Sequence, residues 1–438
     1  MNIAAVQACL GLLALTCGQV LFWRRRDNVI GYLQGGLFVT TLMIPLLGTT
    51  VFDEFDPEVT HLYANLIAVG GAAYLVGLCV GAPLGSTPAK KARFTFVQPD
   101  MSKKLLRLLT VRTRTLAIFG GLVLAAGFLI MGYAPLLASN RVAAKYGIGH
   151  YAAGFERGAL VYRLGLALAS TVLPIALAVA YRRKKLIDWT IGLALIAGLS
   201  LSLSRGLAFS GVLLFGIALA ISRKVRAGII FLVVALSFVA GSLSNEIFFS
   251  IQRDSQSLAT RVAAHAPDIR DHLSFLRGFR MRGEQTTGWT LIAAGISPKK
   301  GHYDPSTYAL RTVYGDVEAV PSGGLRLPAP LWGYVSFGFL GAALWSFVAG
   351  FFTGWGTTRI KGLLDDVYQS PDSALNLTVA TVFFTGTYGV LSSFYFASTA
   401  LLVQFAIALY MGRILAAPER FQPARFETPT PRPRERIR

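Results

Sequence analysis

Apolar stretches of about 20 residues recur along this chain, and short loops rich in Lys and Arg separate them. A helix of that length satisfies its own backbone hydrogen bonds while it crosses the hydrocarbon core of a bilayer. The composition agrees, since 53% of the 438 residues are hydrophobic and the mean hydropathy is +0.53. We therefore predict an all-α polytopic membrane protein with about eleven transmembrane helices. They cover residues 3–22, 29–48, 62–82, 115–133, 161–181, 188–203, 207–221, 228–245, 328–354, 375–390 and 397–412.

The basic loops give these helices a predicted orientation. Clusters such as Arg24–Arg26, Arg182–Lys185 and Arg223–Arg226 alternate with short loops that carry few cations. Because cytoplasmic loops carry the excess of Lys and Arg, we expect the N-terminus outside and the C-terminus in the cytoplasm. The net charge of +20 then reflects this orientation and contact with membrane lipids that are anionic, and it gives no reason to expect a nucleic-acid partner.

Residues 1–413 form the predicted membrane domain, and residues 414–438 form a predicted disordered, basic cytoplasmic tail. One large extracytoplasmic loop, residues 246–327, is inserted between spans eight and nine. A loop of this length is too long for a passive connection, which indicates a function. Within it, Pro267–Arg282 is predicted to be a helix with an apolar stripe of Ile269, Leu273 and Leu276, and Gly278 is placed to end it.

Arg205 stands in a Ser-Arg-Gly turn between two apolar runs, so the two runs predict a hairpin with an arginine near the outer face. A guanidinium near hydrocarbon is costly without an anionic partner, which makes Arg205 a candidate binding residue. Arginine also dominates among the other outer cations, and its planar fork suits bidentate recognition of phosphate. The further candidates for binding an anionic substrate are Arg141, Lys145, Arg157, Arg277, Arg280, Arg311 and Arg326.

The sequence gives no reason to expect a cofactor or a metal. It contains no Walker A and no Rossmann glycine motif, and the spacing of its five histidines matches no zinc site. Each histidine is expected to be a solvated loop residue. The only acidic cluster, Phe52–Glu58, has two interpretations: a divalent-cation site, or an acidic outer loop shaped by the charge bias that places arginine inside. We favour the second.

The number of spans, the Ser-Arg-Gly turn at Arg205, the large outer loop and the span entry Phe337-Gly338-x-x-Gly341 together resemble the Wzy-type oligosaccharide repeat-unit polymerases, the O-antigen and exopolysaccharide polymerase family. The resemblance implies a GT-C-like glycosyltransferase of the bacterial inner membrane. Such an enzyme transfers a glycan from undecaprenyl diphosphate to a lipid-linked repeat unit at the outer face. The resemblance makes undecaprenyl-diphosphate-linked oligosaccharide the expected ligand, and a chain-length regulator and a flippase candidate partners.

The chemistry implied by this resemblance needs a general base, because the acceptor hydroxyl must lose a proton. The candidates lie where the outer loop returns to the membrane: Glu318 first, then Asp316 and His302. Two alternatives stay open. An O-antigen ligase would place a histidine near an asparagine, but His302 has no neighbouring asparagine. A lipid-linked oligosaccharide flippase would need ionisable groups at the bilayer midplane. No Asp or Glu lies in the core of a predicted span, so a flippase is ranked behind the two transferases.

Overall fold

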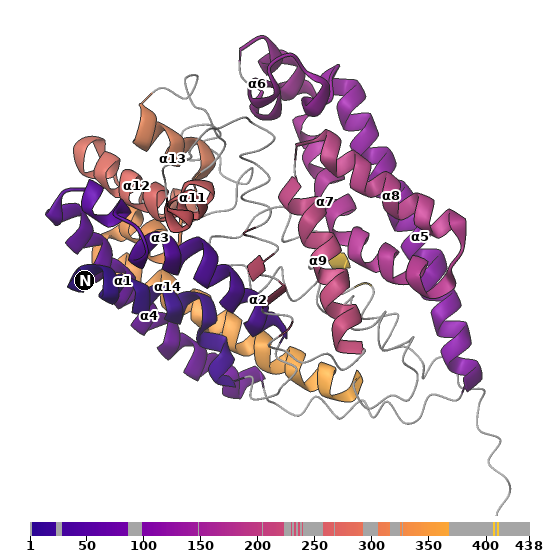
Figure 1. Ribbon diagram of the computed structural model, residues 1–438, viewed down its shortest axis with the longest axis horizontal. Coiled ribbons are helices and arrows are strands. Elements are labelled where there is room, and N and C mark those ends of the chain that lie inside the picture. Colours follow the sequence, from indigo (N-terminus) through magenta and orange to yellow (C-terminus); the bar gives the residue numbers. More distant parts are fainter. Residues whose placement is uncertain are drawn as a thin grey trace, which may run out of the picture.

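The computed structural model describes residues 2–22, 29–85, 99–147, 149–203, 205–222, 257–266, 268–291, 305–315 and 327–367, with isolated positions between 229 and 239, at 325, and between 406 and 410. Every regular element in these ranges is a helix (Figure 1). Five of the described helices are long and apolar enough to cross a membrane: Ile3–Phe22, Pro57–Gly85, Arg107–Met131, Ala143–Arg183 and Ala329–Thr358. The all-α membrane class is confirmed. Predicted spans 228–245, 375–390 and 397–412 fall wholly or mainly outside the described residues, as does the tail 414–438.

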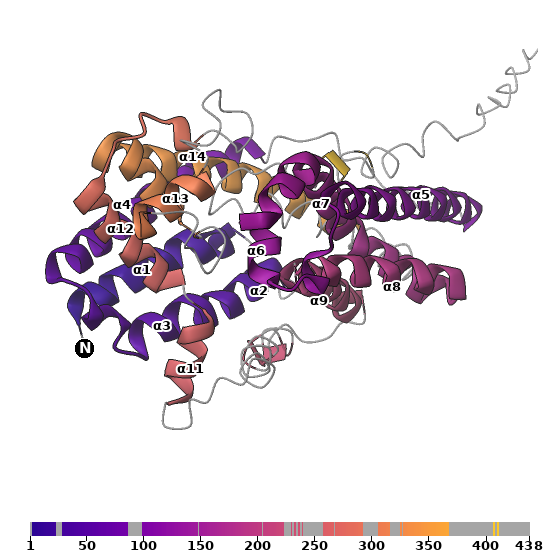
Figure 2. The ribbon, with the colours of Figure 1, turned by 90° about the horizontal axis from the view of Figure 1, so that it is seen from above.

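The helices form two groups that have separate hydrophobic cores and stand side by side in Figures 1 and 2. The first group has four helices from the N-terminal part of the chain and four from its later part. They are α1 (Ile3–Cys17), α2 (Val29–Phe38), α3 (Ile44–Leu47), α4 (Pro57–Gly85), α11 (Leu258–His265), α12 (Asp268–Arg282), α13 (Pro305–Tyr314) and α14 (Ala329–Val367). Short turns join or follow them: η1 (Gly18–Phe22), the π-helical η2 (Val39–Met43), η3 (Val51–Glu54) and η6 (Trp289–Leu291).

The second group contains the middle of the chain. Its elements are α5 (Pro99–Met131), η4 (Pro135–Leu137), α6 (Arg141–Tyr146), η5 (Gly149–Tyr151), α7 (Ala152–Arg183), α8 (Leu186–Leu201) and α9 (Arg205–Ser222). Its core is built around α7, whose residues from Ala167 to Ala180 are all buried. Ile407, from the last predicted span, belongs to this core as well. A helix that is apolar on every side is typical of the centre of a membrane bundle.

Glycines hold α4 against α14. A Cβ atom added at Gly77, Gly81 or Gly85 would overlap a backbone carbonyl of α14, and one added at Gly350 or Gly354 would overlap a carbonyl of α4. The glycines recur every four residues on each helix, which is the small-xxx-small pattern that lets membrane helices approach closely. Because apolar surface gains little by leaving lipid, such close packing is the main source of stability for this pair.

The contacts also give the directions of the helices. Residues of increasing number on α4 meet residues of increasing number on α14, so these two helices are parallel. α1 also runs parallel to α4, since Gly11 faces Ile67 and Gly18 faces Leu75. By contrast α5 and α7 are antiparallel, because Gly120 lies beside Leu168 while Gly127 lies beside Tyr162. These relative directions agree with the predicted alternation of spans, while the assignment of one end to the outside stays a prediction.

α14 is not the single continuous helix predicted for residues 328–354. Phe337 (φ −147°, ψ 26°) and Gly338 (φ 65°, ψ −154°) leave the helical region, and the helix bends so sharply that Gly333 and Gly341 approach each other. The Gly338 conformation is open essentially only to glycine. The Phe-Gly-x-x-Gly sequence therefore marks a break in α14. The segment before the break packs with the large loop, where Thr286 N donates to Val335 O at 3.0 Å.

Candidate functional site

Helix α12 of the large loop packs directly on the first helical group. Ile269, Leu273 and Leu276 are fully buried there, which confirms the predicted helix and its apolar face. Gly278 does not end the helix, which continues to Arg282. A Cβ at Gly278 would overlap the carbonyl oxygen of Thr312, so this glycine is needed for close approach to α13 instead.

His272 is also buried, contrary to the expectation of a solvated loop histidine. It lies on α12, and its Nδ1 atom is 2.9 Å from the hydroxyl of Tyr63 on α4. Phe52 packs beside Tyr63, with ring centroids 6.3 Å apart. The histidine thus forms a polar contact between the large loop and α4, at a buried position where an unpaired imidazole would be costly.

The arginines of α12 contact the acidic segment Phe52–Glu58, which leads into α4. Arg270 Nη2 pairs with Glu54 at 2.7 Å, Arg280 pairs with Glu58, and the Arg277 guanidinium lies 5.2 Å from the centre of the Phe55 ring. Two of the acidic cluster's carboxylates are therefore engaged by guanidinium groups. Among the residues that the structure describes, no three His, Cys, Asp or Glu side chains come together as a metal site would require.

Helix α13 packs against α12 and ends at Tyr314, two residues before the candidate Asp316 in the chain. Tyr308 donates to the carbonyl of Glu284 at 2.8 Å, and Arg311 is half-buried. The Arg282 guanidinium lies beside Gly315, directly before the candidate Asp316 in the chain. Partial burial, together with the carboxylate of Asp271, raises the pKa of Tyr314 and favours its protonated hydroxyl. Asp316, Glu318, His302 and Arg326 themselves lie outside the described residues.

A second set of predicted cations lies on the other helical group. Arg141 opens α6, which Asn140 caps by accepting from Ala143 N at 3.1 Å, and Lys145 lies in its last turn. Arg157 is exposed on α7, and its Nε donates to the carbonyl of Ala153 at 3.1 Å. Arg141 is exposed as well. Exposed guanidinium groups at a helix start are available to a phosphate ligand.

The hairpin predicted around Arg205 is present. α8 ends at Leu201, Leu203 takes a left-handed conformation with φ 56°, and Arg205 is the first residue of α9. The turn is attached to α7, because the Tyr162 hydroxyl donates to the carbonyl of Ser202 at 3.2 Å and both residues are buried. Arg205 therefore starts a helix whose first-turn N–H groups lie towards the end of α7 that carries Tyr162.

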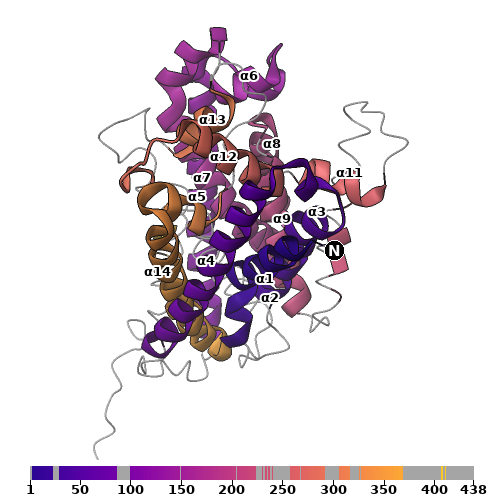
Figure 3. The same cartoon turned by 90° about the vertical axis from the view of Figure 1, so that its left-hand side faces the viewer.

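The two cationic surfaces lie towards the same end of the molecule. Figures 1 and 3 show α6 near the top, with α12 and α13 below it on the same half, while α14 and α5 extend to the opposite end. The structure thus brings Arg277 and Arg280 together on α12, and Arg141 and Lys145 on α6. Arg157 and the Arg205 turn belong to the second group with α6.

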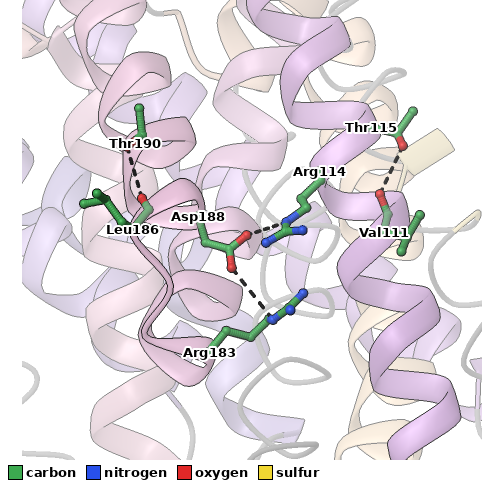
Figure 4. Close-up of polar contacts among 7 residues, drawn as sticks. All are labelled: Val111, Arg114, Thr115, Arg183, Leu186, Asp188 and Thr190. Atoms are coloured by element: carbon green, nitrogen blue, oxygen red, sulfur yellow. Dashed lines mark hydrogen bonds and ion pairs between the residues drawn. The ribbon is translucent and has the colours of Figure 1, made fainter.

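A further ionic cluster, which the sequence did not reveal, lies where α7 ends and α8 begins (Figure 4). Asp188 on α8 accepts from Arg114 Nε of α5 at 2.5 Å, and its other oxygen lies 3.8 Å from Arg183 Nε of α7. Its side chain is 2% exposed. The sequence pattern that could have indicated this cluster is an acidic residue, Asp188, shortly after the basic run Arg182–Lys185 and on the same helical face as Gly192.

No protein-family model, no curated protein and no solved structure matches this chain.

Proposed function

We propose that this protein is a polysaccharide polymerase. It transfers a glycan from undecaprenyl diphosphate to a lipid-linked repeat unit at the outer face of the bacterial inner membrane. The observation that carries the proposal is the position of Arg205, which opens α9 in a turn between two apolar helices, α8 and α9. That turn lies towards the same end of the molecule as the arginine-bearing helices α6 and α12 (Figure 1).

The proposed reaction breaks the bond between the anomeric carbon and the diphosphate oxygen, and forms a bond from that carbon to an acceptor hydroxyl oxygen. Negative charge develops on the departing diphosphate, and preorganised cations stabilise it. Arg205 and the first-turn N–H groups of α9 supply positive potential there. Exposed Arg141 and Arg157 on the same helical group add to it. Undecaprenyl diphosphate leaves with the electron pair of the broken bond.

The acceptor proton goes to a general base. Asp316 and Glu318 follow α13 in the chain, and Asp316 comes directly after Gly315, which lies beside the Arg282 guanidinium. Glu318 is the first candidate, with Asp316 and His302 next.

Glu318→Gln keeps the shape of the side chain and removes the base, so turnover should fall far more than donor binding. If purified Glu318→Gln and Asp316→Asn both polymerise at the wild-type rate, the base is His302 or another residue.

The glycan of a deletion strain tests the reaction class. A polymerase defect leaves single repeat units on the carrier outside. A ligase defect instead leaves long chains on the carrier, and a flippase defect leaves single repeats inside, so either result would contradict the proposal.

Complementation of the deletion strain with variants then tests Arg205. Arg205→Lys should fail to restore polymer, because an ammonium lacks the planar fork. Arg112→Lys, the same change at an exposed arginine towards the opposite end, should restore it.

A further inference from the structure

Helix α8 connects the ionic cluster at one end of the second group to the Arg205 turn at the other. Its buried face is a single stripe, which begins with the Asp188 carboxylate and ends at Ser202. The stripe between them consists of Gly192, Leu195 and Leu199. From Asp188 to Ser202 a straight helix rises about 21 Å.

The middle of this stripe is apolar: Gly192 packs against Leu177 of α7, and Leu195 and Leu199 are buried. Van der Waals packing of this kind holds α8 against its neighbours. Polar contacts at the two ends of the stripe add a directional constraint on the position of α8 along its axis.

Each end of the stripe carries such a polar contact. At one end the Asp188 carboxylate accepts a hydrogen bond from Arg114 of α5 and lies close to Arg183 of α7 (Figure 4). At the other end the Tyr162 hydroxyl of α7 donates to the carbonyl of Ser202. A carboxylate that is 2% exposed between arginines of two neighbouring helices cannot move away from them without becoming an unpaired buried charge.

We propose that Asp188 is a positioning residue: its ionic contacts with Arg114 and Arg183 fix α8 along its axis, and α8 in turn holds the Arg205 turn at the depth where the diphosphate binds. Asp188 acts through α8 and touches no substrate. The effect on polymer formation rests on the proposed function. The mechanical part, that the cluster at one end controls the turn at the other, stands without it.

The mechanical part can be measured by labelling the turn. Ser204→Cys is introduced into the full-length chain after Cys9, Cys17 and Cys79 are replaced by alanine, and intact cells are treated with a membrane-impermeant maleimide. Asp188→Asn should increase the labelling rate severalfold, because the turn loses its fixed position. Glu156→Gln, which removes an exposed carboxylate from α7, is the matched control and should leave the rate unchanged.

Two milder variants keep the test decisive if Asp188→Asn fails to insert. Arg183→Gln removes only the 3.8 Å contact, and Tyr162→Phe removes the hydrogen bond at the other end of the stripe. Each should raise the labelling rate by a smaller factor. Unchanged or slower labelling in all the inserted variants would overturn the proposal.

Polymer formation is then compared in the same variants without Ser204→Cys. Loss of polymer that follows the increase in labelling supports the positioning role in the proposed reaction. Faster labelling with polymer at the wild-type level would overturn that role and leave a purely mechanical contact. If the deletion strain has no polymer defect, the proposed function is wrong, while the labelling result still decides whether the ionic cluster controls the turn.

Discussion

The hydroxyl of Tyr63 and the Nδ1 atom of His272 lie 2.9 Å apart, and neither side chain is exposed to solvent. Tyr63 belongs to a membrane helix, while His272 belongs to the large loop. This hydrogen bond joins the buried face of α12 to α4, so it helps to fix the position of the exposed arginines on α12. The loop is thus a packed part of the first helical group in its α12 segment.

Tyr63→Phe should lower the free energy of unfolding by about 1–3 kcal/mol, because it removes a hydrogen bond to a buried imidazole. The thermal denaturation midpoint of the protein in detergent would show this. Tyr133→Phe is the matched control, since its half-buried hydroxyl makes a longer bond of 3.4 Å to Tyr151 O. Equal shifts for the two variants would contradict a special role for Tyr63.

Gly81→Ala should destabilise the first helical group by about 1–3 kcal/mol or more, since the added methyl group would overlap the carbonyl of Phe351. Gly216→Ala on α9 is the control: nothing lies within 4 Å of its added methyl group. Alanine favours helix over glycine, so this control should be neutral or slightly stabilising. Detergent-solubilised protein that resists heat equally in both variants would refute the packing argument.

Reporter fusions test the predicted orientation. Alkaline phosphatase is active only when exported, so a fusion after residue 300, in the large outer loop, should be active. A fusion after residue 100, in the basic segment before the membrane part of α5, should be inactive. The reverse pattern would place α12 and its arginines in the cytoplasm and end the polymerase proposal.

The ion pairs of α12 separate a structural from a functional role for its arginines. Arg280 and Glu58 are 41% and 76% exposed, so their pair should contribute only about 0–1 kcal/mol to stability. Arg280→Gln should therefore leave the melting temperature nearly unchanged and still reduce polymer formation. Glu58→Gln, which breaks the same pair from the other side, should retain activity. Equal loss of activity in both variants would indicate that the pair only holds the loop.

Chelation tests whether arginines alone neutralise the leaving diphosphate. Activity should survive EDTA, and the double variant Asp53→Asn/Asp56→Asn should remain active, because guanidinium groups provide the positive charge. Polymer formation in membrane vesicles measures both. Loss on chelation that magnesium restores would move the site to the outer loop before α4.

Hydrophobicity and charge alone predicted the helical class, the hairpin at Arg205 and the five helices that are long and apolar enough to cross a membrane. Local patterns suffice for these, because a span needs only length and apolarity. The stripe of Ile269, Leu273 and Leu276 likewise predicted α12. What these residues pack against could not be predicted, since it depends on partners far away in the chain.

Three features show where such prediction stops. His272 is polar and lies in a loop, so only its distant neighbour Tyr63 explains its burial. Gly278 has the signature of a helix end, but the approach of α13 is what requires it. Asp188 is the first residue of the predicted span 188–203, and the sequence alone does not show that Arg114 of α5 and Arg183 of α7 lie beside its carboxylate.

The glycine contact between α4 and α14 also has a consequence for how the protein is made. α4 ends at residue 85, whereas α14 begins at residue 329, so the ribosome delivers the two halves of this contact far apart in time. Until residues 347–358 are synthesised, the backbone along Gly77, Gly81 and Gly85 has only lipid or a transient neighbour against it. Assembly of the first helical group is therefore completed late in biogenesis. A nascent chain that stalls before Ala329 exposes the unpacked glycine face of α4 in the membrane.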